Sequence, residues 1–540
     1  MPPTPRAPRT LQTGDVFLGF FCLYLFTASR SAPFGDAVPM WEAAENLVRH
    51  GSFAISRPWP VNAPVGRGGL YYPVAALLAC LVHVPGALLQ TLLGADSPAA
   101  PHPAVVFTSQ VAPLVLGALV PTLFFRLLRQ LGYDRRQVAG TTLLLGTGTS
   151  VWVYAHRPYS EIVQAVCFLL FLGALCRAAS EPRRHSLLYL GLAASLLINA
   201  KNVYFACLPG ACLCVGYRLR ADRRQLVAGL AWMGAGLLPG LLAFCLYNFV
   251  RWGSLTSSGY GGAVTAGLWR ENILVGLWGQ FLSPGKSVFL YSPVLVLALF
   301  GLRRFVARRR AVAVAVAVTV GPVVLIYARY VFWSGDWAWG PRYLVFALPA
   351  LLLPVAELLG DPSPAAARPG GRAAAAFVAV ALAGFAVQLL GNAYDWSDFT
   401  NVSIDAQHAW LGRPNVSGTP LAPKPCFSCF EHVYPIEWLP PMQPILGQWW
   451  LLEHHIAGDD WRTAEADAPW KRYTSLTLDI QRPYDAAEVD WWLAAPTRHG
   501  IWPVALIGLV LLLAVPVRPW LTALRAVEMP PEAGPARAPP

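Results

Sequence analysis

An acidic side chain, Asp36, stands just before the stretch AVPMWEAAENLVRHGSF, in which apolar residues recur at helical spacing. The stretch therefore predicts an amphipathic helix that lies on a membrane surface. At the start of a helix, an Asp side chain commonly accepts backbone N–H bonds and is favoured by the helix dipole. A carboxylate in the same place could instead take a proton as a general base. Spacing alone leaves both interpretations open, while Glu42 and Glu45 fit a solvated helix face.

Basic side chains at the ends of apolar runs are the next candidates for chemistry, because they could stabilise a negatively charged leaving group. Lys201 interrupts LLINAKNVYF. A charge between two apolar runs is costly and usually functional, although a lysine at a helix end can also extend its amine to water. Arg342, in GDWAWGPRY, could bind a phosphate through two parallel hydrogen bonds or mark the membrane interface beside tryptophans.

Two short polar motifs add further candidates. Lys286 follows Pro284 and Gly285, a turn that could present backbone N–H groups to a phosphate. The loop AHRPYSE supplies Arg157, another candidate cation, and Glu161. Glu161 could cap the apolar run that follows it or contact a substrate.

The elements that must position these residues are apolar. Hydrophobic residues make up 55% of the 540-residue chain and charged residues 13%, with a mean hydropathy of +0.46. This composition favours many membrane spans joined by short polar loops. The net charge of +12 is then explained by Lys and Arg in cytoplasmic loops. No basic run interleaved with aromatic residues indicates nucleic acid as a partner.

Apolar runs predict about twelve spans, given the roughly 20 residues that one crossing needs. They are residues 16–29, 104–127, 138–155, 161–178, 187–199, 204–217, 226–250, 287–302, 311–331, 343–359, 373–391 and 501–517. Every second connection carries arginines, as at 126–136, 183–184, 218–224, 303–310 and 368–372. This alternation places both termini in the cytoplasm of an inner (plasma) membrane protein and the other loops in the periplasm. The first run reads as an uncleaved helix, and residues 72–93 as an interfacial or re-entrant helix.

These spans divide the chain into parts. Residues 1–14 and 518–540 are predicted cytoplasmic tails, residues 15–391 a transmembrane domain that includes a first periplasmic loop over 30–103, and 501–517 the last span. Residues 392–500 are predicted to form a periplasmic domain rich in tryptophan, and its alternating stretch TSLTLDI predicts a strand. The fold class is thus an all-α polytopic membrane protein, with amphipathic helices on its outer face and a small C-terminal periplasmic α+β domain.

The ten cysteines divide into two groups. Eight lie in or beside apolar runs and fit small core residues. Cys426 and Cys429 lie in a polar segment, where an oxidising compartment favours a disulfide between them. A metal site would need more ligands than the neighbouring Glu431 and His432 supply.

Several motifs together resemble the GT-C superfamily of membrane glycosyltransferases, which includes protein O-mannosyltransferases and aminoarabinose transferases that use polyprenyl-phosphate sugars. They are Gly35-Asp36 followed by WEAAENLVRHGSF and GRGGLYYP, then NFVRWGS, LSPGKSVFLYSPVL and WSGDWAWGPRYLVFALPALLLP. The motifs occur in the order typical of this superfamily over about residues 15–400, and the rest of the chain matches less well. The resemblance implies a GT-C-like fold for the transmembrane domain.

The resemblance also implies roles for individual residues. Asp36 matches the acidic residue of the first outer loop that acts as general base. Its neighbour here is Ala37 rather than a second acid, which leaves open whether Asp36 works alone or with Glu42 or Glu45. Residues expected to bind substrate are Lys201, Arg342, Lys286, Arg157, Glu161, Tyr71, Tyr72 and Asp336. The expected partners are a polyprenyl-phosphate sugar donor, membrane lipids and a periplasmic glycan, lipid or protein acceptor. No cofactor is expected with certainty, and a divalent metal stays open because only some relatives need one.

The leading hypothesis is transfer of one sugar, with inversion, to an acceptor on the periplasmic face. Nucleotide sugars are cytosolic, so an outward-facing site requires a lipid-linked donor. The alternatives are a multi-pass transporter or flippase and a polymerase or ligase of surface polysaccharide. Transporters usually carry two repeated halves with polar residues near the bilayer midplane. This chain has no evident internal repeat, and its charges gather at the outer ends of spans.

Overall fold

The computed structural model describes residues 10–29, 35–58, 64–94, 103–257, 259, 267–335, 338–360, 371–396, 399, 436–438, 440–457, 506–511 and 517–525. Most of the predicted periplasmic domain lies outside these residues, and so do its predicted strand, Cys426, Cys429 and most of the last predicted span. In the part that is described, the regular elements are helices, and an isolated antiparallel β-bridge pairs Ile55 with Tyr71.

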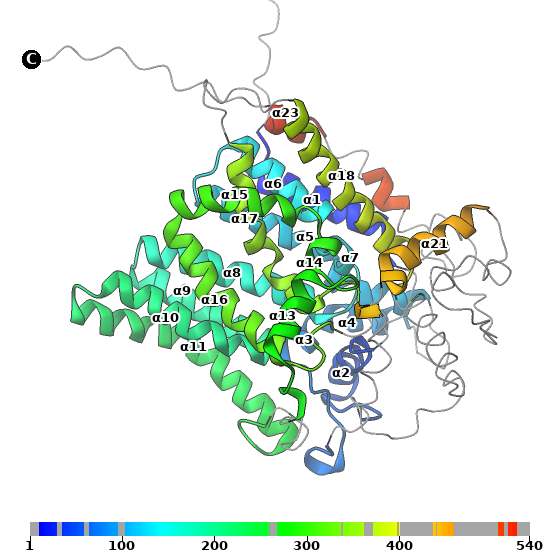
Figure 1. The fold of residues 1–540 in the computed structure, drawn as a ribbon. Coiled ribbons are helices and arrows are strands. Elements are labelled where there is room, and N and C mark those ends of the chain that lie inside the picture. Colours follow the sequence, from blue (N-terminus) through cyan, green and yellow to red (C-terminus); the bar gives the residue numbers. More distant parts are fainter. Residues whose placement is uncertain are drawn as a thin grey trace, which may run out of the picture.

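The helices follow one another along the chain as in Figure 1. In the first half they are α1 (Thr13–Phe26), α2 (Ala37–His50), η1 (Arg67–Gly69), α3 (Leu77–Leu81), α4 (Val84–Leu92), α5 (Pro103–Gln130), α6 (Arg135–Gly148), α7 (Val151–Tyr154), α8 (Ser160–Ser180), α9 (Arg184–Ala200), η2 (Asn202–Ala206), α10 (Cys207–Leu219) and α11 (Arg223–Trp252). In the second half they are α13 (Ile273–Leu282), α14 (Val288–Tyr291), α15 (Leu295–Arg308), α16 (Arg310–Arg329), η3 (Arg342–Ala347), α17 (Leu348–Leu359), α18 (Gly371–Ala393), η5 (Pro440–Met442), α21 (Pro444–Ala457) and α23 (Val517–Arg525).

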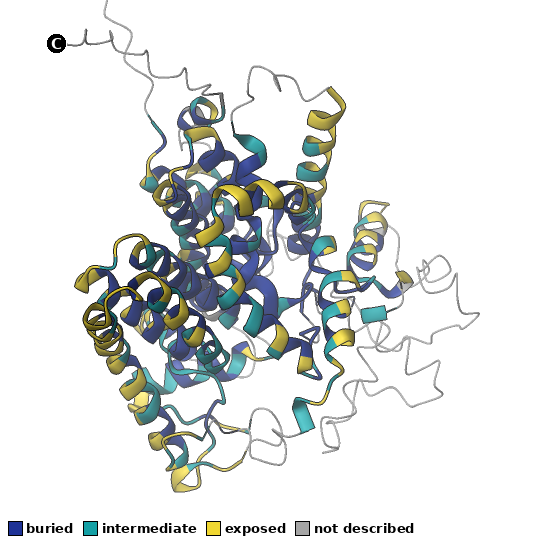
Figure 2. Cartoon of the chain, turned by 60° about the vertical axis from the view of Figure 1, so that its left-hand side comes forward, coloured by how far each residue is buried: buried dark blue, intermediate teal, exposed yellow. Residues whose placement is uncertain are grey.

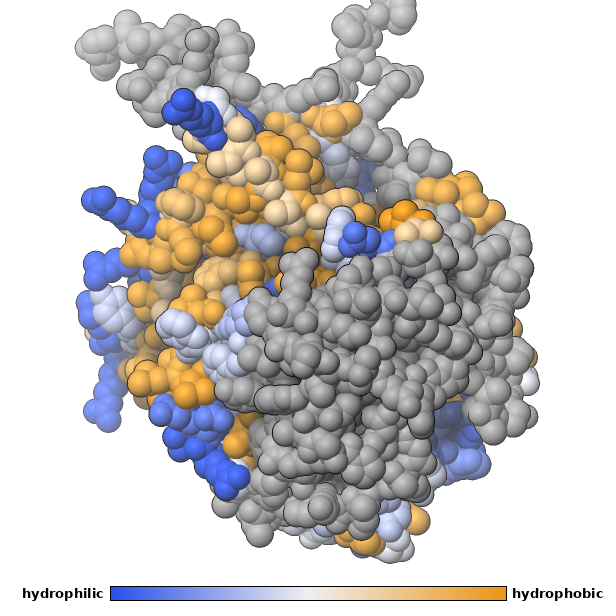
Figure 3. Space-filling view, turned by 45° about the vertical axis from the view of Figure 1, so that its right-hand side comes forward, coloured by the Kyte–Doolittle hydropathy of each residue, from blue (hydrophilic) through white to orange (hydrophobic). Residues whose placement is uncertain are grey.

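Six helical segments in the described residues are long and apolar enough to cross a membrane. They are Val106–Gln130, Ser160–Ser180, Arg223–Trp252, Arg310–Arg329, Arg342–Leu359 and Gly371–Ala393. Most of the apolar window of α11 and of α18 is exposed, which suits contact with lipid rather than with water. Figure 2 shows exposed residues along these outer helices, and Figure 3 shows a broad hydrophobic area beside them. The chain is therefore a multi-pass membrane protein by its helices, while the number of twelve spans stays a prediction.

Two runs predicted as single spans are each broken into two helices. Residues 138–155 form α6 and α7, and residues 287–302 form α14 and α15. The two breaks face each other, since the Ser150 backbone N–H donates to the Ser292 hydroxyl (3.2 Å) and the Ser150 hydroxyl donates to the Tyr291 carbonyl (3.2 Å). A broken helix inside a membrane protein is stable when neighbours satisfy the freed backbone groups in this way.

Small residues allow α9 and α11 to lie in direct contact along their length. A Cβ atom on Gly236 would come within 2.2 Å of the Leu188 carbonyl oxygen, and one on Gly240 within 2.3 Å of the Ser195 side chain. The Ser195 hydroxyl donates to the Gly236 carbonyl at 2.9 Å. Close backbone approach and a shared hydroxyl bond are how helices commonly associate in lipid. This contact fixes the end of α9, where Lys201 follows.

The first outer loop folds onto itself. Helix α2 forms as predicted, but its apolar face packs on protein rather than only on membrane: Met40 and Ala43 contact Ala79 and Cys80 of α3, and α2 also packs on α4. Residues 72–93 form the two short helices α3 and α4, so this region does not contain one continuous spanning helix. This break fits the interpretation of residues 72–93 as an interfacial or re-entrant segment. Asp36 directly precedes α2.

Contacts near the helix ends follow the alternation predicted from the arginines. Arg218 donates to the Ala179 carbonyl and Arg309 to the Leu131 carbonyl, which joins connections predicted to be cytoplasmic. On the other side, Asp36 contacts Arg342 and Arg157 contacts Asp395. Which side faces the cytoplasm stays a prediction.

Candidate active site

Asp36 stands at the N-cap position of helix α2 but does not cap the helix through its side chain. Its backbone is already helical (φ −61°, ψ −19°), and its side chain makes no capping hydrogen bond. Instead, the Arg342 guanidinium donates to the Asp36 carboxylate at 2.8 Å. The Asp36 side chain remains 52% exposed, whereas Arg342 is 12% exposed. The Asp36 carboxylate is therefore about half exposed and ion-paired to Arg342, and it does not act as a side-chain cap of α2.

Glycines make room for both members of this ion pair. Gly35 has φ +56°, and a Cβ atom there would come within 3.3 Å of the Tyr159 hydroxyl. Gly335 has φ +79°, and a Cβ atom there would come within 2.4 Å of the Arg342 side chain. A left-handed backbone in such crowded surroundings favours glycine. Both glycines thus set where the Asp36 carboxylate and the Arg342 guanidinium lie.

Lys201 joins the same cluster. It follows the last residue of α9, and its amine lies 4.7 Å from the Tyr343 ring centre and 5.6 Å from that of Tyr327. Burial lowers the pKa of Lys201, the Glu161 carboxylate acts to raise it, the Arg342 charge lowers it, and Asp36 raises it. Four predicted site residues therefore lie in one cluster: the carboxylates of Asp36 and Glu161 and the cations Lys201 and Arg342.

Glu161 is the buried member of this cluster. It lies in the first turn of α8, is 3% exposed, and its Oε2 atom has no hydrogen-bond partner in the described part of the chain. An unpaired buried carboxylate oxygen is costly unless something binds it.

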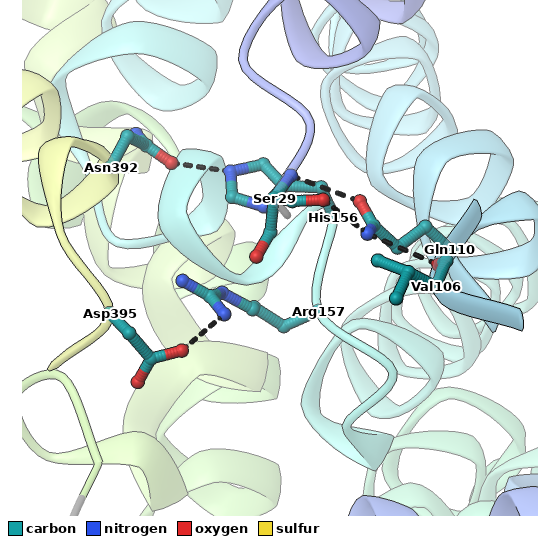
Figure 4. Close-up of polar contacts among 7 residues, drawn as sticks. All are labelled: Ser29, Val106, Gln110, His156, Arg157, Asn392 and Asp395. Carbon is teal, nitrogen blue, oxygen red and sulfur yellow. Dashed lines mark hydrogen bonds and ion pairs between the residues drawn. The ribbon is translucent and has the colours of Figure 1, made fainter. Parts of the chain in front are cut away.

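Arg157 lies beside this cluster but serves as an anchor. It is buried, and its guanidinium donates to Asp395 at 2.6 Å (Figure 4). The guanidinium also lies over the Trp396 ring, 4.9 Å from the ring centre. Its neighbour His156 contacts the Asn392 amide oxygen. Burial, followed by the Arg157 charge, lowers the pKa of His156 to about 3, so this imidazole stays neutral. The loop between α7 and α8 is therefore fastened to the segment that follows α18.

The residues Asn392, Asp395 and Trp396 were not predicted as site residues. They follow the end of an apolar run, as Lys201 does, and this signal could have singled them out. Tyr159 connects them to the acid, because burial and then the carboxylates of Asp395 and Asp36 raise the pKa of its hydroxyl well above the usual range. Asp395 thus lies close enough to act electrostatically on the same tyrosine as Asp36.

Lys286 is buried, and its side chain binds a backbone carbonyl. Its amine donates to the Ala338 carbonyl at 2.6 Å, in the segment that leads to Arg342. The N–H of Gly285 donates to the Glu437 carbonyl (3.1 Å) and the N–H of Lys286 to the Ser283 hydroxyl (2.8 Å). The turn at 284–286 therefore directs its N–H groups into the protein rather than toward an open phosphate site.

Tyr71 and Tyr72 lie in the contact between the first loop and α11. The Tyr71 carbonyl accepts from the Ile55 N–H at 2.9 Å, and the Tyr72 ring packs edge-on against Trp252 at 6.0 Å. Arg251 fastens this contact by donating to the carbonyls of the 73–75 segment. The structure thus places both tyrosines in the packing of the loop. Asp336 lies outside the described residues.

No group of three or more His, Cys, Asp or Glu side chains that could hold a metal ion occurs among the residues that the structure describes. The eight cysteines within them are free. The chemistry available here is that of two carboxylates, one guanidinium and one amine. They could take a proton from a hydroxyl and stabilise an anion within one site.

No protein-family model matches this chain, and no curated protein matches it. Solved structures that resemble it include ArnT from Cupriavidus metallidurans bound to undecaprenyl phosphate, with 16% identity over 95% of this chain and 76% of that chain and a TM-score of 0.44. The oligosaccharyltransferase of Archaeoglobus fulgidus has 12% identity, coverage of 79% and 63%, and a TM-score of 0.40. Arabinosyltransferase EmbB from Mycobacterium smegmatis has 13% identity, coverage of 97% and 44%, and a TM-score of 0.42. All three are GT-C glycosyltransferases, the superfamily that the sequence motifs resemble. Because their TM-scores are below 0.5, the function of the site is inferred from this chain's own residues.

Proposed function

We propose that this protein is a membrane glycosyltransferase that moves one sugar from a polyprenyl-phosphate donor to an acceptor hydroxyl on the periplasmic face. The observation that carries the proposal is the Asp36–Arg342 ion pair, half open to solvent, with the charges of Lys201 and Glu161 beside it. The resemblance of the surrounding motifs to polyprenyl-phosphate-dependent enzymes supports the same donor. The apolar helices around the site suit the lipid tail of such a donor.

The proposed reaction is a single displacement. The acceptor oxygen attacks the anomeric carbon of the sugar, the bond from that carbon to the donor phosphate breaks, and the acceptor proton passes to the Asp36 carboxylate. One displacement inverts the anomeric centre. The departing phosphate gains charge, and Arg342 and Lys201 are the cations that would stabilise it.

The Asp36–Arg342 ion pair predicts that the donor binds before Asp36 accepts a proton. Before the donor binds, the Arg342 guanidinium donates to the Asp36 carboxylate. A donor phosphate competes for the same guanidinium, because Arg binds phosphate through the donors that it offers to a carboxylate. Donor binding therefore frees the Asp36 carboxylate to accept the acceptor proton when the leaving group is in place.

The test is transfer of sugar from a polyprenyl-phosphate sugar by the purified protein in proteoliposomes. Asp36→Asn keeps the shape of the side chain and removes the base, so the rate should fall by about 100-fold or more. Glu42→Gln is the matched control, because this acid accepts only from the Ser56 N–H at an exposed position, and it should leave the rate near that of the wild type.

Full activity of Asp36→Asn would reject Asp36 as the base. Absence of transfer from any lipid-linked sugar by the wild type, together with movement of substrate across the liposome membrane, would favour a transporter instead. Chemical analysis of envelope glycans in cells with and without the protein would then identify the acceptor class.

A further inference from the structure

A cavity of about 500 Å³ opens at the C-terminal end of α8, whereas Glu161 stands at its N-terminal end. A helix of this length separates the two places by roughly 30 Å. The residues that line the cavity are Gln130, Leu131, Cys176, Arg177, Ala179, Ser180, Glu181, His185, Ser186, Ala311, Val312 and Ala315. They come from four helices and are remote from the proposed active site.

Two helices begin at this cavity. His185 and Ser186 belong to the first turn of α9, and Ala311 and Val312 to the first turn of α16. Neither helix start has a side-chain capping bond. The N–H groups of a first turn lack partners within the helix, and together with the helix dipole they attract anions.

The backbone carbonyls and the carboxylate beside this cavity already have arginine partners. The Leu131 carbonyl, beyond the end of α5, accepts from Arg309, and the Ala179 carbonyl near the end of α8 accepts from Arg218 at 3.2 Å. The Glu181 carboxylate pairs with Arg183 at 3.6 Å. The groups that remain for a ligand carry positive or partly positive charge. They are the backbone N–H groups in the first turns of α9 and α16 and the Arg177 guanidinium.

Ser186 supplies an independent sign of a missing ligand. It lines the cavity, is 1% exposed, and its hydroxyl has no hydrogen-bond partner among the residues that the structure describes. A buried hydroxyl without a partner is uncommon in folded proteins. In the first turn of α9, this O–H could donate to the same anion as the backbone N–H groups beside it.

From these features we infer that the cavity binds a phosphate group. The spanning segments of α5, α8 and α16 all end or begin at it, so it lies at the level of lipid headgroups on one membrane face. Basic pockets between helix ends on the cytoplasmic side commonly hold anionic headgroups. The phosphate could belong to such a phospholipid or to a soluble phosphate ion. This inference does not depend on the proposed transferase activity.

The experiment uses the full-length protein in detergent. Native mass spectrometry counts bound dioleoylphosphatidylglycerol and, separately, dioleoylphosphatidylcholine, and titration calorimetry measures binding of inorganic phosphate. Arg177→Gln removes one charged donor and should weaken binding about tenfold. Ser186→Ala should weaken it by a smaller factor. Arg304→Gln is the matched control, because this exposed arginine of α15 lies away from the cavity.

Phosphatidylglycerol retained by the wild type and by Arg304→Gln, but lost in Arg177→Gln, would support the site with a lipid as its source. Phosphate binding with the same dependence and no preference for phosphatidylglycerol would support the site with a soluble ion. Equal losses in Arg177→Gln and Arg304→Gln, or no binding of either probe, would overturn the proposal. Unchanged thermal unfolding of each variant without ligand establishes that it is folded.

Discussion

Lys201 is the residue whose protonation should control donor binding. Burial lowers its pKa below that of an ordinary lysine, so its charge is lost at a lower pH. We therefore expect kcat/KM for the donor to fall as the pH rises through this lowered value, because the neutral amine no longer attracts phosphate. Lys201→Arg keeps its charge to higher pH and should move the fall upward. Lys201→Met should have a low kcat/KM at every pH.

Steady-state rates across the alkaline range would measure this effect, with donor concentration varied at each pH. Glu161, Asp36 and Arg342 are the other charged groups that act on Lys201, and the variants leave all three in place. Identical alkaline profiles for the wild type and Lys201→Arg would show that the charge of this residue plays no part in donor binding.

The types of the site residues were predictable, but several of their partners were not. A local pattern favoured Asp36 as a helix cap, because its true partner Arg342 is 306 positions away in the chain. Lys286 and Arg157 read as phosphate ligands for a similar reason, since their partners Ala338 and Asp395 lie 52 and 238 positions away in the chain. Lys201 was identified correctly as an unusual charge, because the apolar runs beside it are local.

At the scale of elements, Arg157 and Asp395 fasten the loop before α8 to the segment after α18. Both side chains are buried, so removing one charge leaves the other uncompensated. Asp395→Asn should lower the free energy of unfolding by about 3 kcal/mol. Thermal unfolding of the purified protein measures this. Glu181→Gln is the control, because its pair with Arg183 is mostly exposed, and it should change stability by less than about 1 kcal/mol. Equal effects of the two changes would contradict the anchoring role.

Helix positions followed from apolar runs and arginines, but the contact between the two helix breaks did not. Residues 138–155 and 287–302 are each long and apolar enough to look like one span, although Pro293 and the Gly- and Thr-rich stretch 146–150 lie at the two breaks. The breaks are stable because Ser150 and Ser292 supply bonds to each other across 142 positions. The pairing of Ser150 with Ser292 cannot be read from sequence spacing, whereas Pro293 and Pro85 are local signals of a helix break.

For the whole molecule, the alternating arginines predict that Asp36 faces the outside and the cavity at Arg177 the inside. A cysteine placed at exposed Arg49 should react with a membrane-impermeant maleimide in intact cells, and one at exposed Arg304 only after lysis. A cysteine-free background is needed, because eight free cysteines lie in the described residues. Labelling in the reverse order would show that the topology is inverted and that the site does not face a periplasmic acceptor.

The ion pair between Asp36 and Arg342 divides the reaction centre between two stretches of chain. A gene cut in the connection between Arg220 and Ala221 would therefore encode two inactive fragments, one with the acid and one with the guanidinium. Because α9 and α11 meet through Gly236 and Gly240, co-expressed fragments should reassociate and recover transferase activity by complementation. The same fragments with Asp36→Asn in the first should reassociate without recovering it.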